Sequence, residues 1–226
     1  MSSHLGHLFT TSVGRKWLVG ATGLGLCGFV LIHMSGNLLL LVGPEAYNTY
    51  AHKLITNPFL YVAEAGLVAI FVVHVGMAVA LAWSNRRARD TGPSRLPAVG
   101  AADRSCFAAR TMILSGLLVL VFTVLHLITF KYGAHYSITH GGVEMRDLYR
   151  LVREKFSEPL YVGWYLFALV VLGAHLSHGA SAVFQSMGLA SVRNPLWRRL
   201  GWAFAAAIAF GFMSQPIYFA LCGGKG

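Results

Sequence analysis

Charged side chains are scarce in this chain. Only 12% of its 226 residues are Asp, Glu, Lys or Arg, and only eight of them are acidic. An average soluble domain is about 25% charged. Hydrophobic residues make up 56% of the sequence, and the mean hydropathy is +0.60. This composition excludes an ordinary soluble domain and indicates an integral membrane protein.

Cysteine is also rare. The three cysteines, Cys27, Cys106 and Cys222, stand far apart, and the sequence contains neither a C-x-x-C nor a C-x-x-C-H motif. Iron–sulfur clusters are bound by grouped cysteines, and c-type haem is attached to C-x-x-C-H. The spacing therefore argues against an iron–sulfur cluster on this chain and against a covalently attached haem.

Apolar runs long enough to cross a bilayer, about 20 residues each, are instead plentiful. The first run is too long for the core of a signal peptide and lacks a cleavage site, so we interpret it as a helix. The sequence predicts an all-α fold in which residues 1–226 form one integral membrane bundle of five transmembrane helices, at about 17–42, 59–83, 108–130, 160–184 and 200–222. We find no internal repeat.

The positive charges predict the orientation of the bundle. With the N-terminus in the cytoplasm, the inner segments carry eleven Lys and Arg residues against two acidic ones, and the outer segments seven against five. This bias favours a protein of the inner (cytoplasmic) membrane with its N-terminus inside and its C-terminus outside. The net charge of +10 is thereby explained by the positive residues on the cytoplasmic side of the membrane, and it does not require nucleic acid as a partner. Trp17, Trp83, Trp197 and Trp202 would lie at the cytoplasmic interface.

The connecting segments have patterns of their own. Residues 45–53 predict a short outer helix, and the stretch from Asn85 to Arg104 predicts a cytoplasmic loop because it contains glycine, proline and five arginines. Apolar residues between Val143 and Phe156 recur at the spacing of an amphipathic helix on the outer surface. Helix 200–222 has no histidine and is predicted to be a packing helix with a kink near Pro216.

Four histidines, one in each of the first four apolar runs, are the candidate functional residues. Ionisable side chains at membrane depth are rare and mark functional sites by default. Counted from the outer helix ends, His33 and His126 lie near the outer face, and His74 and His175 lie deeper. The two levels are separated by about nine residues, or about 13 Å at 1.5 Å per residue.

An outer pair (His33 and His126) and an inner pair (His74 and His175) are what two stacked bis-histidine haems require. Two axial imidazoles leave the iron no open position, which favours electron transfer over oxygen chemistry. A structural metal such as zinc would gather mixed ligands at one level instead. Hydrogen-bonded packing histidines are the competing interpretation, and matched depths on four helices disfavour it.

Two blocks of sequence carry a resemblance to a known family. The first is H-x-x-G-N-L at His33, which continues into the segment from Tyr47 to His52. The second runs from Gly173 to Gly179 and on through Leu189, and a third likeness extends from Asp147 to Val162. In these blocks the chain resembles the di-haem cytochrome b anchor subunit of succinate:quinone oxidoreductases and quinol:fumarate reductases, and the likeness spans nearly the whole chain.

The resemblance implies five transmembrane helices, two non-covalent haems b and a quinone, with a flavoprotein subunit and an iron–sulfur subunit on the cytoplasmic face. It implies ligation of a distal haem by His33 and His126, and of a proximal haem by His74 and His175. A proximal propionate could be bound by His178, although a structural role is an equal alternative. Three cations at the same cytoplasmic level could also bind propionates by charge-assisted hydrogen bonds, and positive-inside bias explains their positions equally well. They are Arg15, Lys16 and Arg110.

Glu64 is the remaining charge within an apolar run, about five residues into helix 59–83. We expect it to be buried at the level of the outer pair, where a carboxyl could take protons from a quinol. A hydrogen-bonded or snorkelling glutamate is the alternative. Some di-haem relatives place a glutamate two residues before the histidine that corresponds to His175, as part of a proton path. Gly173 occupies that position here, which argues against such a path.

The sequence thus predicts a di-haem electron relay that exchanges electrons between quinone, expected to be menaquinone, and the iron–sulfur subunit of a succinate dehydrogenase or fumarate reductase. The chain would be the quinone-reactive subunit, with no dicarboxylate site of its own. Two alternatives stay open. One is the cytochrome b subunit of a hydrogenase or formate dehydrogenase, and the other is a haem-free transporter or anchor that uses its histidines for protons or metal.

Overall fold

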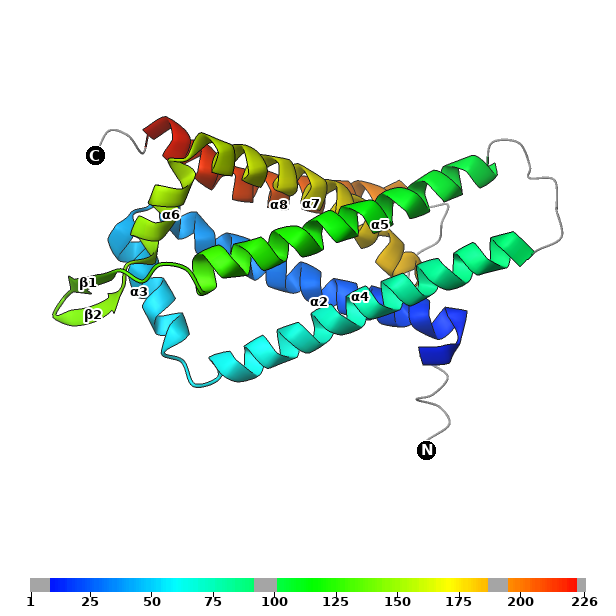
Figure 1. Cartoon of the computed structure of the whole chain (residues 1–226), viewed down its shortest axis with the longest axis horizontal. Helices are drawn as coiled ribbons and strands as arrows, with labels where there is room; N and C mark the ends of the chain where they lie inside the picture. The colour runs from blue at the N-terminus through cyan, green and yellow to red at the C-terminus, as the bar shows by residue number, and fades with distance from the viewer. Residues whose placement is uncertain (1–8, 92–100, 187–194, 223–226) are drawn as a thin grey trace.

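Five long helices run side by side along the longest dimension of the molecule (Figure 1). The structure is a computed structural model, and it describes residues 9–91, 101–186 and 195–222. The long helices are α2 (Ser12–Asn37), α4 (Leu60–Thr91), α5 (Ala101–His126), α7 (Pro159–Ser186) and α8 (Pro195–Cys222). Two short turns extend α2 and α5, a 3₁₀ turn η1 (Leu38–Leu41) and a π turn η2 (Leu127–Lys131).

Each long helix contains a segment that is long and apolar enough to cross a membrane, so the chain is a multi-pass membrane protein. An apolar core of about 30 Å requires about 20 helical residues, and the five segments contain between 21 and 30 residues each. The prediction of five transmembrane helices is therefore confirmed. The segments are Ser12–Leu41, Leu60–Arg87, Thr111–Lys131, Pro159–Ala180 and Pro195–Cys222.

Short elements gather at one end of the bundle, and α2 begins at the other (Figure 1). They are α3 (Pro44–Ile55), the strands β1 (Ser137–His140) and β2 (Val143–Arg146), and α6 (Leu148–Phe156). We call this end the outer end, because the sequence predicts these segments outside. Exposed tryptophans lie toward the opposite end, at the start of α2, near the end of α4 and near the start of α8; they are Trp17, Trp83 and Trp202.

The predicted loop from Asn85 to Arg104 is mostly helical. α4 continues to Thr91 and α5 begins at Ala101, so only residues 92–100 remain between the two helices. Both helices extend beyond their apolar segments, which end at Arg87 in α4 and begin at Thr111 in α5. Arginine and alanine have high helix propensities, so each helix can continue past its apolar segment.

The predicted outer helix over residues 143–156 is wrong in its first part. Val143–Arg146 pairs with Ser137–His140 in an antiparallel hairpin, and the helix α6 begins only at Leu148. Gly141 and Gly142 connect the strands with φ angles of +57° and +79°. Two positive φ angles are typical of a type I′ turn, which glycine adopts without strain. The Gly-Gly pair was the sequence signal for this hairpin.

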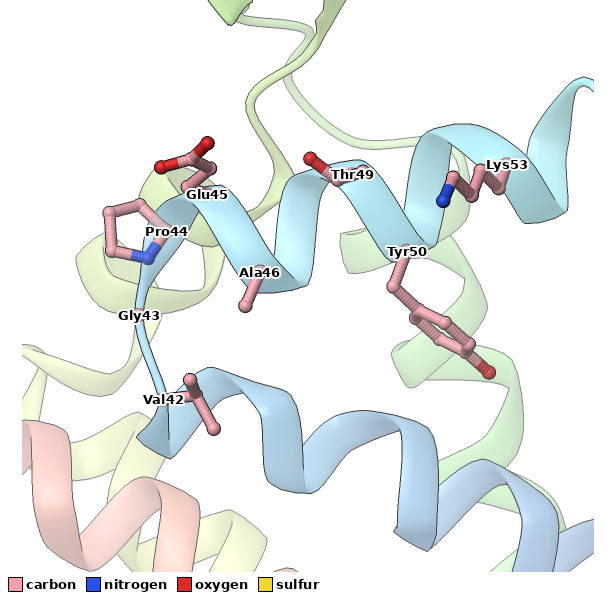
Figure 2. Close-up of a pocket in the computed structure, with 8 residues that line it drawn as sticks. All are labelled: Val42, Gly43, Pro44, Glu45, Ala46, Thr49, Tyr50 and Lys53. Carbon is pink, nitrogen blue, oxygen red and sulfur yellow. The ribbon is translucent and has the colours of Figure 1, made fainter.

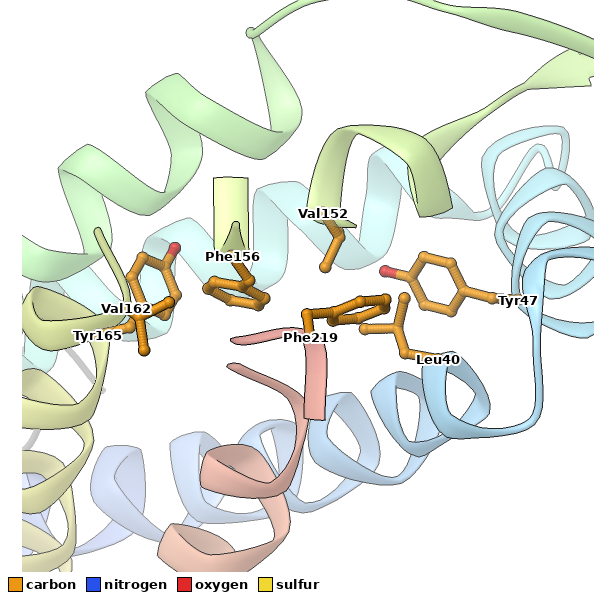
Figure 3. Close-up of a cluster of buried hydrophobic side chains, with 7 residues drawn as sticks. All are labelled: Leu40, Tyr47, Val152, Phe156, Val162, Tyr165 and Phe219. Atoms are coloured by element: carbon orange, nitrogen blue, oxygen red, sulfur yellow. The ribbon is translucent and has the colours of Figure 1, made fainter. Parts of the chain in front are cut away.

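α6 caps the end of the bundle, with its apolar face on other helices. It buries Leu151, Val152 and Phe156. Figure 3 shows the resulting cluster, in which α6 meets side chains from η1, α3, α7 and α8. Asp147 starts α6 by accepting a hydrogen bond from the Arg150 N–H at 3.0 Å.

α8 packs along α7 and against α2, as predicted for a packing helix. A second buried cluster joins the three helices through Met34, Leu176, Ala205 and Ile208. Gly211 allows the close approach, because a Cβ there would lie 2.5 Å from Sδ of Met34. The helix continues through Pro216 to Cys222.

The other four long helices form a square that is open along its diagonals. α2 packs against α4 and α7, α5 packs against α7, and α4 touches α5. The diagonal pairs, α2 with α5 and α4 with α7, pack far less closely. The interior of the square is therefore the place where a flat group could lie between helices.

Candidate functional site

The outer pair of histidines comes from one diagonal of the square. His33 is on α2 and His126 is the last residue of α5, and their ring centres are 5.8 Å apart with the ring planes at 89°. Two imidazoles that share one metal ion, at bonds of about 2.0 Å each, have ring centres about 6 Å apart. The structure thus brings together the two residues that depth counting paired, at a spacing that suits one shared ion.

Aromatic rings surround the outer pair. Phe29 stacks on His33 with ring centres 5.3 Å apart, and Phe212 from α8 lies 5.7 Å from the same ring. Phe122 and Phe130 lie 5.8 Å and 5.3 Å from the ring of His126. Apolar, aromatic walls with a few placed polar groups are typical of cofactor sites.

The H-x-x-G-N motif holds His33 in place. Tyr47 donates its hydroxyl proton to Oδ1 of Asn37 at 3.1 Å, which fixes the orientation of the amide. Nδ2 of Asn37 then donates to the His33 carbonyl at 2.8 Å and lies 3.4 Å from Nδ1 of the His33 ring. Gly36 is needed because a Cβ there would lie 2.5 Å from the hydroxyl of Tyr50. The motif therefore joins α3 to the histidine.

His126 is held by Tyr165 of α7. Nδ1 of His126 and the Tyr165 hydroxyl are hydrogen-bonded at 2.9 Å, and Tyr165 is buried in the cluster of Figure 3. The π turn η2 follows His126 directly. Single π turns occur often at functional sites, and this one redirects the chain at the candidate ligand.

The inner pair comes from the other diagonal, α4 and α7. Nδ1 of His74 lies 3.1 Å from Oγ1 of Thr22 on α2, and Nδ1 of His175 lies 3.0 Å from Oγ of Ser115 on α5. A glycine follows each hydroxyl residue and faces the same ring. A Cβ on Gly23 would lie 3.2 Å from Cε1 of His74, and a Cβ on Gly116 would lie 3.4 Å from Cε1 of His175.

All four rings are thus half-buried. Nδ1 of His74, His126 and His175 lies beside a hydroxyl oxygen of a neighbouring helix, which can accept its proton, whereas Nδ2 of Asn37 lies near both ring nitrogens of His33, at 3.4 and 3.5 Å. Histidines that bind a metal through one nitrogen usually hydrogen-bond through the other, which fixes the tautomer. Groups of three or more His, Cys, Asp or Glu side chains that could hold a metal ion do not occur within residues 9–91, 101–186 and 195–222. The donor sets fit a metal that receives two imidazoles and takes its other ligands from elsewhere, as haem iron does.

The residues predicted to bind haem propionates each have different surroundings in the structure. Arg15 donates through Nε to the Phe9 carbonyl at 2.8 Å and through Nη1 to Ser84 Oγ at 3.3 Å, which joins α2 to α4. Lys16 is exposed. His178 is exposed, and its Nδ1 donates to the Ala174 carbonyl at 2.9 Å. Arg110 is within α5, but its side chain lies outside the described part of the chain.

Arg146 was not predicted as a site residue. Its charge interacts with Tyr47, the residue that holds Asn37 beside His33. Its Nη atoms donate to the carbonyls of Lys131 and Ala134 at 3.3 and 3.0 Å, whereas its Nε is buried without a partner. Burial lowers the pKa of Arg146, and Tyr47 opposes that shift. Burial also raises the pKa of Tyr47. An unpaired guanidinium N–H beside Tyr47 suits the carboxylate of a bound cofactor.

Glu64 is less buried than expected. It forms an ion pair with Lys131 of η2, and their side chains are 35% and 39% exposed. The expectation of a buried carboxyl is wrong because the π turn carries a lysine to the same level of the bundle. The ion pair still lies at the outer end of the bundle, because Lys131 follows His126 by five residues along the chain.

Gly173 faces α8 directly. A Cβ there would lie 3.2 Å from Cβ of Ala209, so a glutamate at this position would push the two helices apart. The space that a carboxylate would need is filled by the contact between α7 and α8.

Two open grooves lie at the outer end of the bundle. One, of about 750 Å³, is lined by Val42, Gly43 and residues of α3 as far as Lys53, including Tyr50, whose ring lies against Gly36 (Figure 2). In Figure 2 the side chains of Ala46 and Tyr50 point from α3 toward the helix below, and Glu45 points away. The other, of about 380 Å³, includes Leu125, the residue before His126.

Sequence reasoning missed the residues that orient the histidines, namely Thr22, Asn37, Tyr47, Ser115 and Tyr165. A signal for two of them exists. The pattern [ST]-G-L-x4-F-x3-H occurs from Thr22 to His33 and again from Ser115 to His126. The expectation of no internal repeat is therefore wrong for these two segments.

Comparisons of the chain with protein-family models, with curated proteins and with solved structures found no match.

Proposed function

We propose that this chain is the di-haem cytochrome b membrane anchor of a succinate:quinone oxidoreductase or quinol:fumarate reductase. It relays electrons between menaquinone in the membrane and an iron–sulfur subunit docked at the end of the bundle where α2 begins. A flavoprotein subunit completes the complex and carries the dicarboxylate site.

The observation that supports this proposal most strongly is the diagonal arrangement of the histidines. Each pair is supplied by two helices at opposite corners of the square, with loose packing between them. A haem is a flat group whose two axial ligands must approach from opposite faces, so opposite corners are the positions that can supply them. Packing histidines would not need matched depths, diagonal placement and a hydroxyl group beside Nδ1 at three of the four rings.

In this proposal, side chains of the chain bind the two haems and orient the imidazoles that ligate them. His33 with His126 would hold the outer haem, and His74 with His175 the inner one. Haem iron supplies one-electron transfer between its ferrous and ferric states. Asn37 and Tyr165 orient the outer imidazoles, and the unpaired Nε of Arg146 would bind an outer propionate. Inner propionates would meet His178, Arg15, Lys16 or Arg110.

Quinone exchange is proposed at the outer level, because both grooves lie at the outer end and one includes Leu125, the residue before His126. Oxidation of a quinol releases two electrons and two protons. The Glu64 carboxylate accepts a proton as the electrons leave, and Lys131 holds that carboxylate at the outer end of α4. In the opposite direction the same carboxyl donates a proton to the reduced quinone.

The first test is the haem content of the full-length chain purified from membranes. A reduced-minus-oxidised spectrum with haem extraction should give two haems b per chain, and a chain without haem would end the proposal. His33→Ala and His126→Ala should each remove the same haem, and His74→Ala and His175→Ala the other. His52→Ala on α3 is the matched control and should retain both.

The second test separates this complex from other oxidoreductases with a cytochrome b subunit. The chain should co-purify with a flavin-containing partner that oxidises succinate. Co-purification with a hydrogenase or formate dehydrogenase subunit instead would overturn the assignment while leaving the haem sites intact. Glu64→Gln should slow quinol turnover with both haems retained, and an unchanged rate would remove Glu64 from proton transfer.

A further inference from the structure

α2 and α5 carry the same functional spacing. A hydroxyl residue precedes the histidine by eleven positions on both helices, from Thr22 to His33 and from Ser115 to His126. Eleven helical residues span about 16 Å at 1.5 Å per residue, which is comparable with the separation of about 13 Å between the two levels. Each of these helices therefore presents an outer histidine of its own and a hydroxyl at the level of the inner pair.

The hydroxyl groups can accept hydrogen bonds from the inner histidines. The Thr22 hydroxyl can donate its single proton to the Leu18 carbonyl at 2.6 Å, which leaves its oxygen to accept from Nδ1 of His74 at 3.1 Å. Ser115 can likewise donate to the Met112 carbonyl at 3.1 Å and accept from Nδ1 of His175 at 3.0 Å. In this arrangement both inner imidazoles are the Nδ1–H tautomer, with the lone pair on Nε2.

The neighbouring glycines set the direction of each ring. Gly23 and Gly116 both face the edge of the imidazole that is formed by Nδ1 and Cε1. The remaining nitrogen, Nε2, is farther from each glycine than Nδ1 is. One helix of each unit thus presents the ligand, and the other orients it; the units are α2 with α4, and α5 with α7.

We infer that Thr22 and Ser115 are positioning residues for the inner cofactor and that they lower its redox potential. The inference rests on the proposed haem content. It goes beyond that proposal because it assigns the tuning of the inner level to two helices whose own histidines belong to the outer level.

The direction follows from the chemistry of the imidazole. An acceptor at Nδ1–H increases the basicity of Nε2, and a more basic ligand stabilises the oxidised metal. Removing the acceptor therefore raises the potential. The outer pair is oriented by different groups, Asn37 and Tyr165, so its potential should not respond to the same change.

The experiment is a potentiometric titration of the full-length chain in which the two haems are resolved by their spectra. Thr22→Val removes one acceptor with little change in shape, and Ser115→Ala removes the other. Each variant should raise the potential of the haem that His74→Ala or His175→Ala removes. The double variant should change its ratio of reduced to oxidised protein about tenfold, which is 59 mV for a one-electron couple.

Matched controls exist on the same helices and on α8. Thr123 donates to the Val119 carbonyl at 2.8 Å, and Ser214 to the Gly211 carbonyl at 2.7 Å, and these hydroxyls form no hydrogen bond to a histidine ring. Thr123→Val and Ser214→Ala should leave both potentials at the wild-type value. Thr22→Ser keeps the acceptor and should behave as wild type.

The outcomes separate this inference from the proposed function. A wild-type chain without haem overturns the proposed function. A wild-type chain with two haems whose potentials are unchanged in Thr22→Val and Ser115→Ala overturns the inference alone, as does a shift confined to the outer haem. Loss of the inner haem in Thr22→Val, with retention in Thr22→Ser and in the controls, supports it, because only the acceptor distinguishes these variants.

Discussion

The hydroxyl of Tyr165 lies 2.9 Å from Nδ1 of His126, and the ring that carries it is part of the buried cluster at the outer end. One tyrosine therefore joins the packing of the cap to the orientation of a candidate ligand. Its two roles can be separated, because the hydroxyl and the ring can be changed independently.

Tyr165→Phe should weaken the outer site while leaving the fold intact. The phenyl ring keeps its contacts with Phe156 and Phe122, and the hydroxyl's interactions with His126 and Tyr161 are lost. Loss of a hydrogen bond that orients a metal ligand typically costs about 10–100-fold in affinity. Haem titration into the apoprotein measures the effect. Tyr149→Phe, which packs against the same cluster through Phe219, is the control, and equal effects of the two changes would contradict the assigned role.

Gly23→Ala and Gly116→Ala should each disturb the inner level only. The added methyl would lie 3.2 Å from His74 or 3.4 Å from His175, so the imidazole must shift or the helices must separate. Haem content after purification should fall toward one per chain, with the outer spectrum retained. Gly28→Ala, on the same helix as Gly23, meets no atom within 4 Å and should retain two haems. Retention of two haems in all three variants would contradict a tight inner site.

Asn48→Ala should destabilise the outer end. Asn48 is fully buried, donates to Oδ1 of Asp147 at 2.8 Å and accepts from the Tyr149 N–H at 2.9 Å, so it joins α3 to the start of α6. Leaving buried partners unsatisfied costs about 1–3 kcal/mol. Thermal unfolding in detergent should show the loss. Thr49→Ala changes the neighbouring side chain, which lines the open groove of Figure 2, and it should have little effect.

Protonation of Glu154 should loosen the cap at low pH. The carboxylate accepts hydrogen bonds from Arg150 and Tyr136, both at 2.8 Å, and they hold the pKa of Glu154 below its ordinary value of 4.5. A carboxyl with a lowered pKa stabilises the fold at higher pH, and this contribution is lost as the pH falls through the folded value. The difference in unfolding temperature between wild type and Glu154→Gln should therefore shrink below about pH 4.5. Glu144→Gln in the hairpin is the control, and a difference independent of pH would contradict this role.

The transmembrane helices and the histidine pairs could be predicted because both depend on the chain alone. Apolar length identifies a span, and a rise of 1.5 Å per residue converts position into depth. His33 and His126 could thus be paired without knowledge of packing. Thr22 and Ser115 could not be assigned in the same way, because their role depends on which helix lies beside α4 and α7.

The errors have local causes. The amphipathic pattern after Val143 hid a hairpin, since alternating residues also suit a strand and the Gly141-Gly142 turn outweighs the helical spacing. Glu64 was expected to be buried because a lone carboxyl in an apolar run suggested a desolvated site. The π turn after His126 brings Lys131 beside it, and a turn of this kind has no clear sequence signature.

The open diagonals have a consequence for how the bundle is assembled. α2 contacts α4 and α7 closely, and α7 contacts α5, whereas α4 and α5 contact each other least, so the bundle is held least firmly at α4 and α5. Each proposed haem would take one ligand from one of these two helices and the other from α2 or α7. Cofactor insertion would then link α4 and α5 to the rest of the bundle, and the first haem to bind would align the ligands for the second. Mechanical integrity of the membrane domain and its electron-carrying capacity would be acquired in the same step.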